Sequence, residues 1–85
     1  MTKSVFTPAY RLLLHALIQA RHEAHLTQTI LAQRLKKPQS YVSKYESGER
    51  RLDVIEVLDI LRVLNRKPAR FFADLEKVLP DDSVK

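Results

Sequence analysis

The chain has 85 residues, 45% of them hydrophobic and 29% charged, with one glycine and no cysteine. This composition is typical of one small globular domain, and it excludes a disordered chain, a disulfide framework and a cysteine-ligated zinc finger. The formal net charge is +5, with nine basic and three acidic residues in 1–51 against six and seven in 52–85, which favours a polyanionic partner although a solvated face would look similar.

The first two predicted elements are helices that follow a loose arm at residues 1–6. Thr7 and Pro8 form a typical N-cap and first helical position, so a helix is expected at about 8–24. Thr27 is the predicted N-cap of a second helix, at about 27–35. Between the two helices, His25 and Leu26 form the link.

A basic turn at residues 36–38 precedes a third helix, expected at about 39–47, with an unusual outward face. Val42 and Tyr45 lie one turn apart and are expected to be buried. The opposite face carries an amide, small hydroxyls and a lysine in place of paired Glu and Lys: Gln39, Ser40, Ser43, Lys44 and Ser47. These groups match the hydrogen-bonding edges of bases in the major groove, so this stretch is interpreted as a helix-turn-helix that reads DNA.

Two further helices are expected to complete the chain, at about 53–64 and 68–79. Gly48 can end the third helix in a left-handed conformation, and Asn65 can do the same for the fourth. Asp53 and Glu56 form a capping box. Val54, Val57, Leu58, Leu61 and Leu64 recur at intervals of three and four, which predicts the buried stripe of the fourth helix. A polar tail is expected at 80–85.

The span from about Leu13 to Phe72 resembles the lambda-repressor-like (Xre/Cro-type) helix-turn-helix family. The matching residues are Thr27-Gln28, Leu31-Ala32 with Leu35, and the run from Pro38 to Asp53, PQSYVSKYESGERRLD. This resemblance implies an all-α, compact five-helix bundle in a single domain (residues 1–85), with the second and third helices as the helix-turn-helix. The family often has glycine where this chain has Lys36, which therefore needs a left-handed conformation or a different turn.

The resemblance also assigns roles to individual residues. The third helix of such proteins enters the major groove, so Gln39, Ser40, Ser43 and Lys44 are expected to contact bases. The expected phosphate contacts are Gln28, Lys37, Arg50, Arg51 and Arg21. In related proteins, an arginine at the place of Arg21 pairs with a glutamate at the place of Glu46. Two roles are possible for Tyr41: a partly packed ring, which is slightly favoured, or a contact to phosphate or to a thymine methyl group.

The fifth helix raises the question of a partner chain. One small core has room for Phe72 and Leu75, but it is harder for it to cover every apolar residue of this helix. The alternatives are a closing helix packed on its own bundle and a two-fold interface formed by Phe71, Phe72, Leu75, Val78 and Leu79. The second alternative is favoured, and it predicts a homodimer on a nearly palindromic operator.

Catalytic and metal-binding roles are not expected. His22 and His25 lie three residues apart, but His25 lies where the first helix is expected to have ended, so surface or helix-end histidines are the preferred interpretation. There is no cysteine, no glycine-rich phosphate loop and no Ser/His/Asp set. No cofactor or small-molecule ligand is predicted, and no segment is apolar and long enough to span a membrane.

The leading functional hypothesis is a sequence-specific transcriptional regulator, encoded by a bacterium or phage, that acts on double-stranded operator DNA in the cytoplasm. The alternative is a protein-interaction module, such as an antitoxin, that mainly binds a partner protein. Steep salt dependence and preference for one operator would support the first hypothesis.

Overall fold

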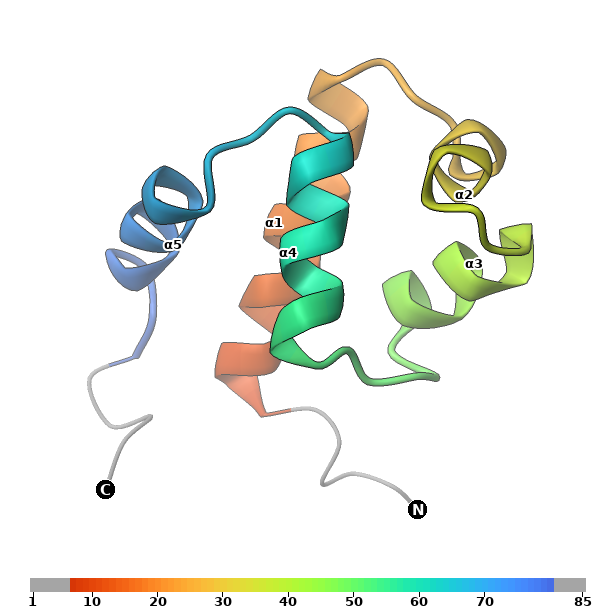
Figure 1. Cartoon of the computed structure of the whole chain (residues 1–85). Coiled ribbons are helices and arrows are strands. Elements are labelled where there is room, and N and C mark those ends of the chain that lie inside the picture. The colour runs from red at the N-terminus through yellow and green to blue at the C-terminus, as the bar shows by residue number, and fades with distance from the viewer. Residues whose placement is uncertain (1–6, 81–85) are drawn as a thin grey trace.

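The computed structural model describes residues 7–80, and five α-helices form within this range (Figure 1). They are α1 (Pro8–Glu23), α2 (Gln28–Leu35), α3 (Gln39–Ser47), α4 (Val54–Val63) and α5 (Pro68–Glu76). Residues 7–80 contain no strand, so the predicted all-α fold is confirmed. In Figure 1, α2 and α3 lie on one side of α1 and α4, and α5 lies on the other. The predicted arm at 1–6 and the tail beyond Pro80 lie outside the described residues.

Side-chain caps begin three of the helices. Thr7 and Thr27 each accept a hydrogen bond at 3.1 Å from the backbone amide three residues later. The Asp53 carboxylate accepts from the Glu56 amide at 2.7 Å, and the Glu56 carboxylate accepts from the Asp53 amide at 2.9 Å. These bonds satisfy amides that lack a partner within the helix. The starts of α1, α2 and α4 are therefore encoded locally.

Left-handed residues follow α1, α2 and α4, and none of the three is a glycine. His25, Lys36 and Asn65 have φ angles of 60°, 61° and 60°. In each case the next residue donates its amide to a carbonyl five positions back, at 2.9–3.2 Å, which closes the last turn of the helix. By contrast, α5 ends at Glu76 and not at the predicted residue 79, because residues 77–79 are held by shorter-range turn hydrogen bonds.

The buried residues of the core come from α1, α2, α3 and α4 and from Leu64 directly after α4. Its largest fully buried side chains are Leu17, Leu31, Val42, Tyr45, Ile60 and Leu61. Two expectations about packing were wrong. Val54 is 69% exposed because the buried stripe of α4 begins one turn later and includes Ile60. Phe71, and not Phe72, packs against the core, because Phe71 shares the partly buried face of α5 with Leu75, one turn later.

Two buried tyrosines are expected to respond differently to loss of their hydroxyl group. The Tyr10 hydroxyl accepts a hydrogen bond from the Leu52 amide at 3.0 Å. The Tyr45 hydroxyl is buried and has no hydrogen-bond partner among residues 7–80. Tyr10→Phe should therefore lower the free energy of unfolding by about 1 kcal/mol, while Tyr45→Phe should leave it unchanged or raise it. Urea unfolding of both variants measures the difference, and an equal loss in both would contradict this account of the core.

Every helix within residues 7–80 is too short or too polar to cross a lipid bilayer.

Candidate nucleic-acid interface

The helix α3 buries one side and presents a polar one. Val42 and Tyr45 are fully buried, one turn apart. The residues predicted to contact bases lie away from this side, three of them exposed and Ser43 partly buried at the edge: Gln39, Ser40, Ser43 and Lys44. The exposed surface of α3 therefore carries hydrogen-bonding groups on a helix that is anchored from behind.

The turn between α2 and α3 fixes the angle between the two helices. Lys36 takes the left-handed conformation (φ 61°, ψ 42°), which costs a lysine about 1 kcal/mol relative to glycine. The Lys37 amide donates to the Ala32 carbonyl at 3.0 Å, and the Lys36 amide donates to the Gln33 carbonyl at 3.1 Å. Of the two alternatives expected for Lys36, the structure therefore shows the left-handed conformation, and α2 packs directly on α3.

A bidentate ion pair connects the end of α1 to the end of α3. The Arg21 Nε and Nη2 atoms donate to the two Glu46 carboxylate oxygens at 2.8 and 3.0 Å. Arg21 also donates to the Leu26 carbonyl at 2.8 Å. The two charged side chains are only 11% and 6% exposed, and the hydrogen bond to Glu46 raises the pKa of the Arg21 guanidinium above its ordinary value. This pair restrains α3 relative to α1 and to the link before α2.

Two glutamines extend this ion pair to the exposed face of α3. The Gln28 amide nitrogen donates to Glu46 Oε1 at 2.8 Å, and the Gln39 amide nitrogen donates to Gln28 Oε1 at 2.9 Å. The first residue of α3 is thereby tied to the first residue of α2, and through Glu46 to Arg21 on α1. Each glutamine amide still has one N–H that these bonds do not use.

The contact between Gln28 and Gln39 was not predicted from the sequence, which indicated separate roles for them. The only signal in the sequence is that each glutamine is the first residue of its helix. What the sequence lacks is the distance between the two helix starts, which depends on how α2 packs on α3. The structure therefore adds one element to the expected site: a continuous row of hydrogen bonds from Arg21 through Glu46 and Gln28 to Gln39.

A second cluster forms around the ring of Tyr41. The ring is partly buried and meets Tyr45 edge-on, with centroids 5.6 Å apart and an interplanar angle of 72°. The Lys37 ammonium lies 5.2 Å from the centroid of the Tyr41 ring, and the Arg50 guanidinium lies 4.9 Å from it. Tyr41 is thus a packed ring that also supports two of the residues predicted to contact phosphate.

The helical arrangement has counterparts among known proteins. A family model described as helix-turn-helix matches residues 17–71. A solved structure of an XRE-family like protein from Pseudomonas syringae pv. tomato str. DC3000 is 46% identical to this chain, with a TM-score of 0.83. The match covers 93% of this chain and 96% of the other.

This chain belongs to the XRE-type helix-turn-helix family. The family resemblance expected from the sequence is therefore confirmed, and membership indicates a DNA-binding regulator. None of the curated proteins compared matches the chain.

The predicted phosphate contacts of this XRE-type protein fall into three places. Arg21 and Gln28 belong to the row of hydrogen bonds that ends at Gln39. Lys37 and Arg50 lie against Tyr41. The Arg51 guanidinium lies apart from these, 4.2 Å from the centroid of the Tyr10 ring on α1.

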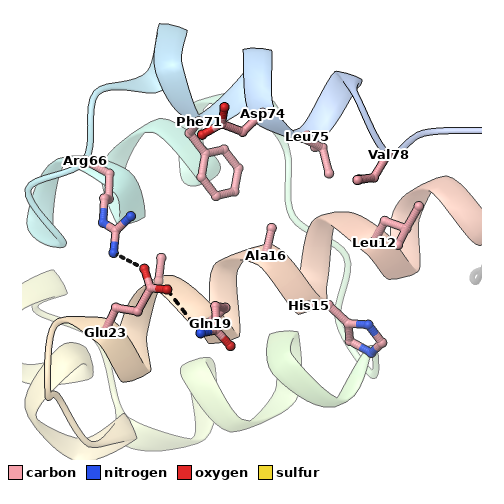
Figure 2. A pocket seen from close by; sticks show the side chains of 11 residues that line it. Leu12, His15, Ala16, Gln19, Glu23, Arg66, Phe71, Asp74, Leu75 and Val78 are labelled. Carbon is pink, nitrogen blue, oxygen red and sulfur yellow. Dashed lines mark hydrogen bonds and ion pairs between the residues drawn. The ribbon is translucent and has the colours of Figure 1, made fainter.

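Three of the five predicted dimer residues of the XRE-type bundle line a groove between α5 and α1 (Figure 2), and Phe72 and Leu79 do not. Phe71, Leu75 and Val78 face α1 across a volume of about 410 Å³. At one end the groove is bounded by an ion pair between Arg66 and Glu23. Phe72 lies edge-on to Phe71 and is 38% exposed, and Val78 is 60% exposed. No residue of α5 is fully buried.

Proposed function

We propose that this chain is a sequence-specific transcriptional regulator that binds double-stranded DNA, with α2 and α3 as the helix-turn-helix. The observation that carries the proposal is the polar face of α3, which is anchored by Val42 and Tyr45 behind it and by the Gln28–Gln39 contact at its start. A rigid helix of this kind fits the major groove, where each base pair presents a distinct set of donors and acceptors.

The proposed base contacts are Gln39, Ser40, Ser43 and Lys44. Gln39 uses one amide hydrogen to bind Gln28, which leaves its amide oxygen and its second N–H for a two-point contact with adenine. Lys44 is exposed and can donate to guanine O6 and N7. The hydroxyl groups of Ser40 and Ser43 can each bond to a donor or to an acceptor on a base edge. Because Gln28 restrains Gln39, little side-chain entropy remains to be lost when Gln39 binds a base.

The proposed phosphate contacts are Arg21, Gln28, Lys37, Arg50 and Arg51. Gln28 is the first residue of α2, where unpaired backbone amides and the helix dipole attract an anion. Lys37 and Arg50 are exposed, so they can approach the sugar–phosphate backbone on the side of Tyr41. Such contacts hold the register of the protein on the duplex and contribute little sequence information.

The proposed active form is a homodimer in which α5 meets its copy. This proposal is supported by the incomplete burial of α5 and by the exposed side chains of Phe72 and Val78. Two-fold symmetry would place the two α3 helices about one DNA turn apart on a nearly palindromic operator. No enzymatic step, cofactor or small-molecule effector enters the proposal, and the proposed site of action is bacterial or phage DNA in the cytoplasm.

The test is selection of bound duplexes from a random pool, followed by titration of the selected duplex and of a scrambled one at several salt concentrations. We expect binding to the selected duplex to be at least about a thousandfold tighter, with affinity falling steeply as salt rises. Sedimentation of the complex should give two chains per duplex. Equal affinity for both duplexes would overturn the proposal, and a tight complex with a protein partner would then favour the interaction module.

A further inference from the structure

The Arg50 guanidinium already holds an anion when no DNA is bound. Its Nη1 and Nη2 atoms donate to the two carboxylate oxygens of Glu56 at 3.1 and 2.8 Å. Nη1 also donates to the Arg51 carbonyl at 3.1 Å. The Glu56 carboxylate therefore occupies the edge of the guanidinium formed by Nη1 and Nη2. A DNA phosphate would bind this edge in the same bidentate way.

The position of Glu56 is fixed independently of Arg50. Its carboxylate accepts the Asp53 amide at 2.9 Å, and its own amide donates to Asp53 at 2.7 Å, so the capping box of α4 holds the side chain at the first turn of the helix. The hydrogen bond from Arg50 and, after it, the hydrogen bond from the Asp53 amide lower the pKa of the Glu56 carboxyl below its ordinary value. The second of these bonds does not depend on Arg50. Glu56 is thus a negative charge that the fold keeps in place whether or not Arg50 leaves it.

The ion pair between Arg50 and Glu56 remains open to solvent, so an incoming phosphate can reach it. The Arg50 side chain is 42% exposed and the Glu56 side chain is 21% exposed. On the other side, Glu56 lines a groove of about 230 Å³ together with Tyr41, Lys37 and Asp59. The groove brings acidic residues of α4 next to basic residues of the α2–α3 region. The negative charge of Glu56 therefore lies beside two proposed phosphate contacts, Lys37 and Arg50.

We propose that Glu56 competes with DNA phosphate for Arg50 and thereby weakens binding of this protein to the DNA backbone. The inference rests on the proposed function, in which Arg50 contacts a phosphate. To make that contact with its paired edge, Arg50 must leave Glu56, and the fixed carboxylate then repels the phosphate. To make it with its remaining N–H groups, Arg50 brings a phosphate close to a carboxylate already bound to the same guanidinium. In either case Glu56 opposes the binding of phosphate.

The test is Glu56→Gln in the full chain. Glutamine is also accepted at this position of a capping box, so the start of α4 is preserved while the charge is removed. The probes are the selected operator duplex and a duplex of unrelated sequence, titrated at several salt concentrations. We expect affinity for both duplexes to rise about fivefold. The dependence of log K on log salt should steepen by about 0.9, the contribution of one phosphate contact.

Two further variants separate competition at Arg50 from a general loss of negative charge. Asp59→Asn removes the same charge one turn along α4, in the same groove but outside the pair, and should raise affinity much less. In an Arg50→Ala background, Glu56→Gln should raise affinity no more than Asp59→Asn does. The inference fails if Asp59→Asn raises affinity as much as Glu56→Gln does, because the effect would then be a general loss of negative charge. It also fails if Glu56→Gln weakens binding, because Glu56 would then orient Arg50 for DNA.

The same titration distinguishes this inference from the proposed function. If the unmodified chain binds neither duplex, or binds both equally, the proposed function itself is wrong and the inference falls with it. If the unmodified chain prefers its operator and Glu56→Gln changes neither affinity nor salt dependence, only the competition between Glu56 and phosphate is wrong.

Discussion

Arg21→Ala is expected to lower the free energy of unfolding by about 3 kcal/mol. The Arg21 and Glu46 side chains are largely withdrawn from solvent (11% and 6% exposed). Truncation of the arginine therefore leaves the Glu46 carboxylate poorly solvated, with the Gln28 amide as its partner. It also removes the donor to the Leu26 carbonyl, which holds the link between α1 and α2. Urea unfolding followed by circular dichroism measures the loss.

Arg66→Ala provides the matched control for this prediction. Arg66 also pairs with a glutamate, Glu23, but the two side chains are 38% and 48% exposed. Water can replace the lost partner there, so the stability of this variant should lie close to that of the unmodified chain. If Arg21→Ala costs no more than Arg66→Ala, the pair with Glu46 does not restrain α3.

Replacement of Gln39 and Lys44 together by alanine is expected to weaken binding to the operator about a hundredfold or more. Each residue supplies a proposed base contact, so the double variant should mainly lose its preference for the operator over other sequences. Binding to a scrambled duplex should change much less, since Lys44 would contribute there only as one charge among several. Parallel titrations of the operator and the scrambled duplex measure both effects.

The control for this double variant removes the same residue types from other surfaces. Gln33 on α2 and Lys77 after α5 are both exposed, and alanine at these two positions should leave operator preference intact. Circular dichroism should show that both double variants are folded. If the double variant at Gln39 and Lys44 keeps its operator preference, the proposal that α3 contacts the bases is wrong.

Features that depend on neighbours in the chain could be predicted from the sequence. Thr7, Thr27 and the capping box at Asp53 and Glu56 mark helix starts because a cap involves residues three apart. The alternation of polar and apolar residues in α3 likewise gave the correct buried pair, Val42 and Tyr45. These signals, together with the resemblance to a family, were enough for the fold class.

Features that depend on distances between helices could not be predicted from the pattern of residues alone. The pair between Arg21 and Glu46 was expected, but only through the resemblance to a family. Val54 fits the apolar period of α4, but nothing in that period says that the core stops one turn short of it. Phe71 and Phe72 are adjacent aromatic residues, and only the orientation of α5 decides which one packs inward. The pair between Arg50 and Glu56 spans the loop before α4, and a charge pattern alone does not reveal whether such residues meet.

The contact between Gln28 and Gln39 has a consequence for redesign of operator preference. A new side chain at position 39 would also remove a partner from Gln28, and so disturb the proposed phosphate anchor at the start of α2. Substitutions that alter base preference are then expected to be non-additive with changes at position 28. A library intended to retarget this protein should vary the two positions jointly. In variants selected at position 39 alone, Gln28 would no longer be held by its hydrogen bond to residue 39.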